Sequence, residues 1–270
     1  MRYLTFLLLI LVPILGIWTF VTAPSYGWWF PEEARTTYGP AIDNLFYWIA
    51  VPIVITFIGT EVVLAWSVLK YSSPRLMGSK GIFSHGSHKL ELIWTAIPAV
   101  VLVLLAFTQM STFAQIKFER GFPDDGPYSI ERPIGELWAS QFDWRARYPD
   151  ANGDLFGVDA FESSFQFVVP ADTGVVFNLR SRDVLHSFFV PAFRLKQDAV
   201  PGMTIPVWFE ASIRPEDEEQ GYSDYDLICA ELCGWGHYKM AGQMRVMRPD
   251  LYDAWVAEQR ASLYSNGEAD

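Results

Sequence analysis

The sequence is poor in the side chains from which redox and metal sites are built, so the few that are present are informative. Among 270 residues there are two cysteines and four histidines. No Cys-x-x-Cys-His stretch occurs, and we find no internal repeat and no low-complexity tract. A c-type haem attached to this chain and a repeat architecture are therefore excluded.

Basic charge is scarce in the second part of the chain. Residues 1 to 112 hold 6 Lys/Arg and 5 Asp/Glu, whereas residues 113 to 270 hold 14 and 26, so the formal net charge of −11 belongs to the second part. An acidic surface keeps a domain soluble, repels nucleic acid and speeds the encounter with basic proteins. The pattern therefore excludes a nucleic-acid partner. A generally solvated acidic surface is the simpler alternative to a docking role.

Long apolar runs are confined to the first part. Leu4 to Val21, Leu45 to Leu69 and Leu92 to Met110 are each about as long as a bilayer span requires. The loop between the second and third runs carries four Lys/Arg and no acid, so the positive-inside rule places it in the cytoplasm. The sequence thus predicts a multi-pass protein of a bacterial inner membrane, with residues 113 to 270 on the periplasmic side.

The first run has two interpretations. Arg2, the apolar stretch and Val21-Thr22-Ala23 resemble a signal peptide, yet Pro24 would follow the cut and is unfavourable there. Residues 1–23 are therefore a signal peptide or an extra transmembrane helix. Residues 24–112 are predicted to form a transmembrane hairpin with spans at about 45–69 and 92–110.

The residues after Phe113 have the pattern of an all-β domain. Turn signals such as "PDANGD" and "PADTG" separate short β-rich runs at spacings typical of a Greek-key sandwich or barrel. Residues 251–263 are predicted to form a short amphipathic helix. The expected strands are Ser164 to Val169, Gly174 to Leu179, Met203 to Ala211, Tyr225 to Cys229 and Gln243 to Val246.

Both cysteines lie in "CAELCGWGHYKM", residues 229 to 240. Cys229, Cys233, His237 and Met240 are spaced 4, 4 and 3, which is also the spacing of one helical face. However, the two glycines beside Trp235 would each cost about 1 kcal/mol in a helix, and the preceding "YDLICA" has the composition of a strand. A loop that follows a strand is the better interpretation.

Three chemistries remain open for this loop. A disulfide is geometrically feasible but leaves His237 and Met240 without a role. Zinc would accept the two thiolates with His237 and His186, because His85 and His88 lie on the cytoplasmic side, but it rarely uses a thioether. Copper uses every residue: two thiolates can bridge two ions, one imidazole can cap each ion, and a thioether and a backbone carbonyl can complete the two sites.

With this loop, the sequence resembles that of cytochrome c oxidase subunit II. The loop is similar to the family's binuclear copper pattern C-x-E-x-C-G-x-x-H-x-x-M. Upstream, "DVLHSFFVPAFRLKQDAVPG" (183 to 202) resembles the segment with the second histidine, and "ELIWTAIPA" (91 to 99) resembles the start of the second hairpin helix. The resemblance spans about residues 40 to 260 and implies a cupredoxin-like CuA domain behind the hairpin.

The resemblance also implies residue roles. The Glu231 carboxylate would bind a magnesium or manganese ion shared with subunit I. Glu91 would stand at the cytoplasmic mouth of a proton-uptake path, although a carboxylate favoured by the helix dipole explains it equally well from the sequence alone. The implied ligands of two copper ions are His186, Cys229, Cys233, His237, Met240 and the carbonyl oxygen of Glu231.

One motif departs from the family. Where Q-W-W/Y-W is usual and its first Trp receives electrons from cytochrome c, this chain has "QFDWRARYP", residues 141 to 149. Phe142 takes the Trp position, and two arginines follow. We therefore expect Trp144 or Trp235 to receive the electrons. The donor is expected to be a c-type cytochrome other than a soluble basic one, such as a domain of a partner complex.

The implied function is electron transfer from a c-type cytochrome, through the copper pair, to the haem-copper subunit I. Subunit I, with the other oxidase subunits, would reduce oxygen to water and pump protons. A nitric oxide or nitrous oxide reductase module is the nearest rival, but the "ELIWTAIPA" hairpin argues against the soluble nitrous oxide enzyme. A quinol oxidase subunit would lack the copper ligands. A copper-binding or assembly protein would need neither Glu231 nor the paired helices.

Overall fold

The computed structural model describes residues 2–28, 33–72, 83 and 85–267. The chain forms two compact units, which we describe separately. The first comprises Met1–Pro31 and Asp43–Ser111, and the second comprises Glu32–Ile42 and Thr112–Asp270. Within the range 24–112 that the sequence analysis predicts to form the hairpin, residues 33–42 group with the second unit.

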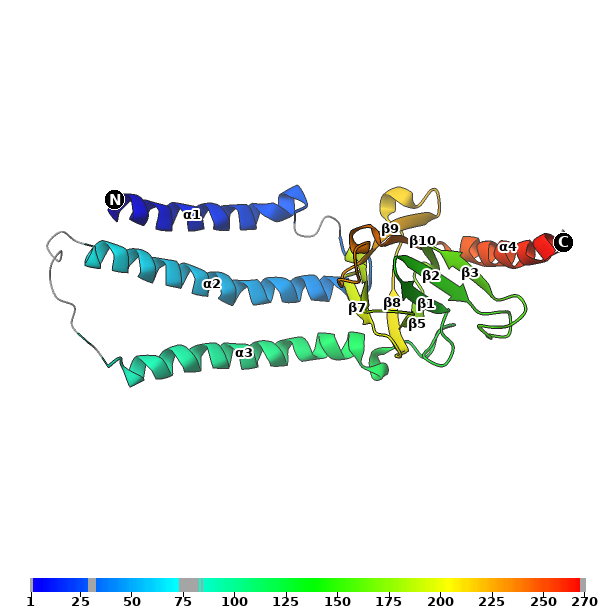
Figure 1. The fold of residues 1–270 in the computed structure, drawn as a ribbon, viewed down its shortest axis with the longest axis horizontal. Helices are drawn as coiled ribbons and strands as arrows, with labels where there is room; N and C mark the ends of the chain where they lie inside the picture. The colour runs from blue at the N-terminus through cyan, green and yellow to red at the C-terminus, as the bar shows by residue number, and fades with distance from the viewer. Residues whose placement is uncertain (1, 29–32, 73–82, 84, 268–270) are drawn as a thin grey trace. The chain divides into compact units, whose positions relative to one another are not determined.

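Three long helices dominate the first unit (Figure 1). They are α1 (Arg2–Thr22), α2 (Gly39–Tyr71) and α3 (His88–Lys117), and a short 3-10 helix η1 (Ala23–Tyr26) follows α1. All three are long and apolar enough to cross a membrane. Their apolar windows are 0%, 6% and 0% buried, so these surfaces need lipid or protein neighbours. The expectation of apolar helices before the outer domain is confirmed.

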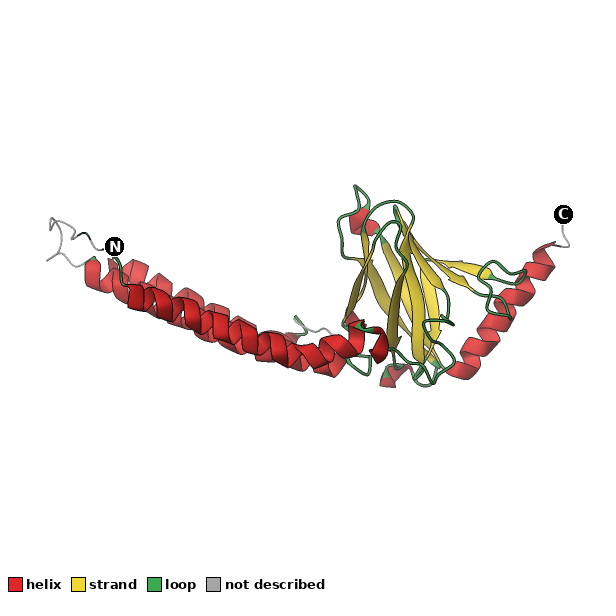
Figure 2. Cartoon of the chain, turned by 90° about the horizontal axis from the view of Figure 1, so that it is seen from below, coloured by secondary structure: helices red, strands yellow, loops and turns green. Residues whose placement is uncertain are grey.

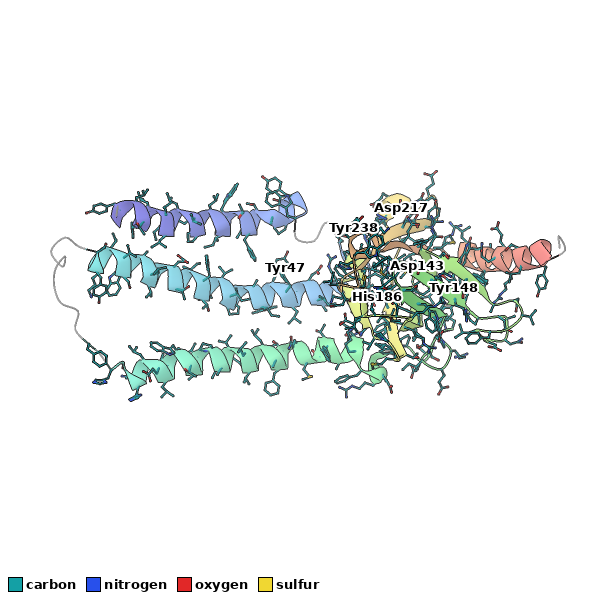
Figure 3. The ribbon with its side chains drawn as sticks, in the orientation of Figure 1. Tyr47, Asp143, Tyr148, His186, Asp217 and Tyr238 are labelled. Carbon is teal, nitrogen blue, oxygen red and sulfur yellow. The ribbon has the colours of Figure 1, made fainter. Side chains whose placement is uncertain are left out.

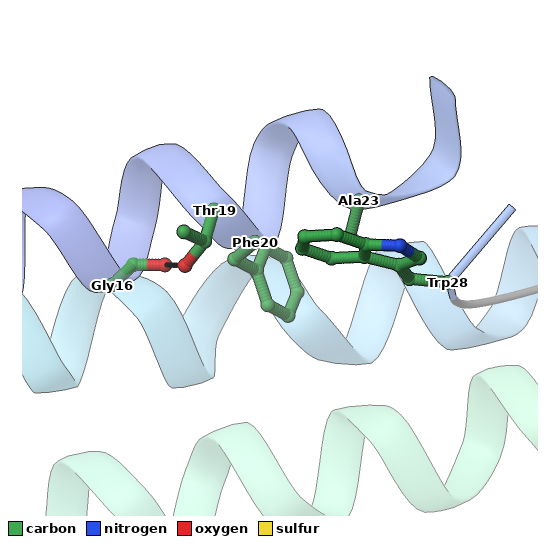
Figure 4. Close-up of a pocket in the computed structure, with 5 residues that line it drawn as sticks. All are labelled: Gly16, Thr19, Phe20, Ala23 and Trp28. Carbon is green, nitrogen blue, oxygen red and sulfur yellow. Dashed lines mark hydrogen bonds between the residues drawn. The ribbon is translucent and has the colours of Figure 1, made fainter. Parts of the chain in front are cut away.

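A cavity of about 450 Å³ lies at the end of α1 (Figure 4). Gly16, Thr19 and Phe20 line it from the helix, and Ala23 and Trp28 close its other side. The Trp28 backbone N–H donates to the Ala23 carbonyl at 3.0 Å, which folds the chain back over the helix end. Its lining is mostly apolar, with no residue of the predicted metal centre.

The second unit is built on two five-stranded sheets (Figure 2). One has the order β3-β2-β1-β5-β8 and the other β4-β10-β9-β6-β7. The first sheet contains β1 (Glu136–Ser140), β2 (Asp143–Tyr148), β3 (Phe161–Ser164), β5 (Gly174–Ser181) and β8 (Ile205–Glu210). The second contains β4 (Gln166–Pro170), β6 (His186–Val190), β7 (Leu195–Ala199), β9 (Tyr222–Cys229) and β10 (Ala241–Met247).

One C-terminal α-helix and four short 3-10 helices complete the described part of this unit. The C-terminal helix α4 (Pro249–Gly267) extends beyond the predicted 251–263. The 3-10 turns are η3 (Glu119–Gly121), η4 (Pro191–Phe193), η5 (Pro215–Asp217) and η6 (His237–Lys239). All five predicted strands are present, and the predicted β domain is confirmed.

Apolar residues that alternate along the strands fill the space between the sheets. Phe177 and Phe188 are fully buried and their ring centroids lie 5.3 Å apart. Residues ahead of α2 are tied to the same body, because the Thr36 hydroxyl donates to the Phe193 carbonyl at 2.9 Å and the Tyr38 hydroxyl to the Trp208 carbonyl at 3.3 Å. The sheets therefore form a rigid frame for the loops at their ends.

Three loops meet at one end of this frame, which we call the site end. They are residues 141–142 between β1 and β2, 182–185 between β5 and β6, and 230–240 between β9 and β10. Parallel pairing of β1 with β5 brings the first two loops together, and pairing of β6 with β9 opposes Phe188 to Cys229. This topology brings together sequence segments about 40 residues apart.

Candidate metal centre

The candidate ligands are held where strands end at the site end. His186 is the first residue of β6, and Cys229 is the last residue of β9. The loop that carries Cys233 then passes through η6 and returns to β10. The Cys229 N–H donates to the Met240 carbonyl at 3.1 Å, which closes the loop at its base. The predicted loop after a strand is confirmed, and the helical spacing of its residues is coincidental.

Five sulfur and imidazole groups converge at this loop, four from the loop and one from His186 on β6. The Sγ atoms of Cys229 and Cys233 lie 3.8 Å apart, and both cysteines are free thiols. His186 Nδ1 lies 3.9 Å from the Cys229 sulfur, and His237 Nδ1 lies 3.7 Å from the Cys233 sulfur. Met240 Sδ lies 3.7 Å from the Cys233 sulfur. Each imidazole therefore lies beside a different sulfur.

A backbone oxygen joins the same cluster. The Cys229 thiol donates to the Glu231 carbonyl oxygen at 3.2 Å. The ligating atoms of His186, Cys229 and Cys233 all lie within 4.8 Å of one another, which is the spacing expected of groups that hold metal. Most of the cluster is shielded from water, since His186 is 0% exposed and Met240 2%. The donor set of soft sulfur and imidazole fits copper or zinc.

The two thiols differ in acidity. Burial acts to raise the pKa of the Cys229 thiol, but hydrogen bonds with His186 and with the backbone of Glu231 and Ser187 lower it to about 6. Burial and the negative charge of Cys229 raise the pKa of Cys233 to about 11. Because cysteine binds metal as the thiolate, metal binding releases a proton from each thiol that is still protonated.

Asp183 orients His186. Its Oδ1 lies 2.8 Å from His186 Nε2, while its Oδ2 accepts from the Gln141 backbone N–H at 2.7 Å. Burial acts to lower the pKa of His186, but Cys229 and Asp183 outweigh it and raise that pKa. A carboxylate on one ring nitrogen turns the other toward a metal. Sequence reasoning missed Asp183, although the spacing "DVLH" was available as a signal.

The turn at residues 141–142 packs directly on the loop. Gln141 Nε2 donates to the Cys233 carbonyl at 2.5 Å. A Cβ atom at Gly236 would lie 2.5 Å from the Phe142 ring, and Gly234 has φ +130°. Gly236 must be glycine because the Phe142 ring approaches it closely. Gly234 must be glycine because of its close neighbours and also because of its positive φ.

The aromatic candidates for electron input have different environments. Trp235 is 76% exposed and its ring centroid lies 5.2 Å from that of Phe142. Trp144 is only 1% exposed, and its centroid lies 6.4 Å from that of His186 (labelled in Figure 3). Trp144 therefore does not contact a protein donor directly, and its expected role in receiving electrons stays a prediction.

Two predicted carboxylates stand apart from the sulfur cluster. Glu231 is half-buried in the loop itself. Glu91 lies in the first turn of α3, in the other unit, where its Oε2 lies 3.1 Å from His88 Nδ1. The described contact of Glu91 is therefore local to its own helix end.

Comparisons with known proteins identify the family. Residues 25–111 match the model "Cytochrome C oxidase subunit II, transmembrane domain", and residues 144–246 match "Cytochrome C oxidase subunit II, periplasmic domain". Cytochrome c oxidase subunit 2 of Alkalihalophilus pseudofirmus is 34% identical over 179 residues, which are 66% of this chain and 47% of that protein. The chain thus spans about half the length of this relative.

Two further similarities come from Bradyrhizobium. The alternative cytochrome c oxidase subunit 2 of Bradyrhizobium diazoefficiens is 26% identical over 94% of this chain and 91% of that protein. The crystal structure of the periplasmic domain of subunit II of cytochrome oxidase from Bradyrhizobium japonicum is 26% identical with a TM-score of 0.40, over 48% of this chain and 94% of that one. Together the two family models cover α2, most of α3 and most of the β domain. The chain is a membrane protein with an outside domain, and it belongs to the cytochrome c oxidase subunit II family.

Proposed function

We propose that this chain accepts electrons for a haem-copper oxidase at a pair of copper ions. Its ligands would be His186, Cys229, Cys233, His237, Met240 and the carbonyl oxygen of Glu231. The observation that supports this most is the arrangement of two sulfurs 3.8 Å apart, with a separate imidazole beside each. Two bridging thiolates with one capping imidazole per ion need this arrangement.

Met240 favours copper over zinc. Its thioether is 2% exposed and lies 3.7 Å from the Cys233 sulfur, so it belongs to the cluster and not to the surface. Zinc sites are filled by thiolate, imidazole and carboxylate, whereas a thioether is a ligand of copper electron-transfer sites. The free thiols in the structure are compatible with either metal.

The protein residues would fix and shield the site. A pair of copper ions held by these residues would supply one-electron exchange. Asp183 holds the His186 ring, and the Gln141 side chain holds the Cys233 carbonyl, so the ligand positions are set before metal binds. Burial of the two cysteines keeps water from the sulfurs. Such preorganisation keeps the structural change on electron transfer small.

Trp235 is proposed as the point where electrons enter. It is the exposed indole of the loop itself. It contacts the Phe142 ring, which lies against Gly236, the residue before His237. The donor would be a c-type cytochrome, free or as a domain of a partner complex. Electrons would pass on to subunit I, where oxygen is reduced to water and protons are pumped.

Substitution of the indoles should separate their roles. Trp235→Phe is expected to lower the rate of copper reduction by a cytochrome about tenfold, equivalent to about 1.4 kcal/mol in activation free energy, because phenylalanine is a poorer site for electron hopping. Trp144→Phe should leave that rate unchanged. Stopped-flow reduction measures both. An unchanged rate for Trp235→Phe would show that Trp235 is not the point where electrons enter.

The remaining assignments complete the proposal. The Glu231 carboxylate would hold a magnesium or manganese ion shared with subunit I, and Glu91 would open a proton path on the cytoplasmic side. We place the chain in a bacterial inner membrane, with the hairpin at 24–112 and the copper domain at 113–270 in the periplasm. Residues 1–23 are left as a signal peptide or a third span.

Co-purification tests this function. The tagged full-length chain, taken from membranes in mild detergent, is expected to carry two coppers and an equal amount of a haem-containing partner, and to consume oxygen with a reduced cytochrome. A copper carrier or assembly protein would be recovered with copper but without stoichiometric haem or oxygen uptake. That result would exclude the proposed subunit role.

A further inference from the structure

The site end carries an exposed aromatic face over the candidate copper loop. We call it the docking face and define it by Phe142, Trp235, Tyr238 and Lys239. Trp235 is 76% and Tyr238 83% exposed, although both are large rings that are usually covered. Exposed Trp and Tyr side chains are typical of protein-binding hot spots.

The docking face reaches the metal ligands by a short route. The Phe142 ring lies against Gly236, and His237 is the next residue. The Phe142 ring also contacts Trp235, and the two ring centroids lie 5.2 Å apart. A partner that covers these two rings is separated from His237 by one layer of side chains. The face is therefore suited to a redox partner.

Charge at the site end differs from charge on the rest of the domain. Its three loops (141–142, 182–185 and 230–240) hold Arg182 and Lys239 against Asp183 and Glu231, which gives a formal net charge of zero. Residues 113–270 as a whole hold 14 Lys/Arg against 26 Asp/Glu, a net −12. The acidic charge of this unit thus lies away from these loops.

Two acids at the site end, Asp183 and Asp143, are engaged in local contacts. Asp183 faces His186 and accepts backbone N–H groups from Gln141 and Val184. Asp143 at the start of β2 forms an ion pair with Arg145 at 2.8 Å. Glu231 is half-buried and is assigned above to a second metal.

The two cations at the site end lie over aromatic rings, one exposed and one half-buried. Lys239 Nζ is 4.6 Å from the Trp235 ring centroid, and the Arg182 guanidinium carbon is 5.2 Å from that of Trp138. Both residues are exposed. The docking face therefore offers aromatic surface and positive charge, and the four residues that define it include no carboxylate.

We infer that the donor cytochrome binds this docking face with an uncharged or acidic rim around its haem, and not with a lysine-rich one. Charges act over about 8–10 Å at physiological salt, so the local balance decides which face of a partner can approach. A strongly basic cytochrome would be drawn to the acidic surfaces away from the copper loop. This inference rests on the proposed electron-accepting function.

Stopped-flow reduction of the copper-loaded full-length chain in detergent tests the inference. The two donors are a basic mitochondrial-type cytochrome c and a bacterial cytochrome c of negative net charge. We expect the acidic donor to react faster, with a rate constant that falls as salt rises. The basic donor is expected to react slowly, with a rate constant that salt leaves unchanged or increases.

Charge-reversal variants localise the effect. Lys239→Glu combined with Arg182→Glu is expected to lower the rate constant for the acidic donor about tenfold and to raise that for the basic donor. Arg132→Glu, an exposed control remote from the site end along β1, should change neither rate. The copper absorption spectrum of each variant verifies that the site is intact.

The outcomes separate this inference from the proposed function. A basic donor that reacts faster and loses rate with salt would overturn the inference, as would a charge-reversed variant with unchanged rates. So would a chain that ascorbate reduces but neither cytochrome does. A chain that binds no copper pair, or whose copper ascorbate cannot reduce, would instead refute the proposed function, and the inference with it.

Discussion

Replacing either cysteine of the loop with serine is expected to destroy the two-copper centre. Cys229→Ser and Cys233→Ser each remove one of two sulfurs that lie 3.8 Å apart, and a hydroxyl is a poor ligand for copper. We expect bound copper to fall from two ions to one or none. The rate of reduction by a cytochrome should fall by more than about 100-fold, beyond the range typical for losing an outer partner of a ligand.

A matched control exists at the same end of the domain. Met203 is 53% exposed and lies outside the sulfur cluster, so Met203→Leu should leave copper content and rate unchanged. Met240→Leu, which removes the buried thioether, should weaken or alter the site. Metal analysis and circular dichroism of the purified variants distinguish loss of copper from loss of fold. Two coppers and a normal rate in Cys233→Ser would contradict the proposed ligand set.

Removing the carboxylate behind His186 should weaken copper binding by about 10- to 100-fold, the range typical of outer partners of metal ligands. Asp183→Ala leaves His186 Nε2, which is 2.8 Å from the carboxylate in the structure, without its acceptor. The ring is then free to turn its Nδ1 away from Cys229. Competition with a copper chelator measures the affinity.

Two further variants show whether the effect is specific. Asp183→Asn keeps an acceptor oxygen beside the imidazole and should recover most of the affinity. Asp226→Ala removes an exposed carboxylate from β9, the strand that ends at Cys229, and should have no effect. Equal copper affinity in Asp183→Ala and the wild type would show that Asp183 does not position the ligand.

Much of the site followed from the sequence because its chemistry is local. Cys229, Cys233, His237 and Met240 lie within twelve residues, and soft ligands in a glycine-containing loop indicate a metal site. His186 is different, since its distance from Cys229 is set by the pairing of β6 with β9. The sequence points to His186 because the other two candidate histidines lie on the cytoplasmic side, and the family resemblance implies its role as a copper ligand.

The aromatic residues show what strand alternation adds. Phe142 and Trp144 are two residues apart, and nothing in their local sequence distinguishes their environments unless β2 is predicted. In the structure β2 begins at Asp143 with a strict alternation of half-buried and buried residues, so Trp144 points into the core and Phe142 stays in the turn. Because charged residues occupy every second position, β2 contains no apolar run that would predict a strand.

The two-copper claim is tested most directly by low-temperature EPR of the full-length, copper-loaded chain in detergent. One unpaired electron shared equally between two copper nuclei gives a hyperfine pattern distinct from that of a single ion. We predict this shared-electron spectrum for the wild type, and its loss in Cys233→Ser. A spectrum of one isolated copper, or no copper signal in the oxidised wild-type protein, would contradict the binuclear site.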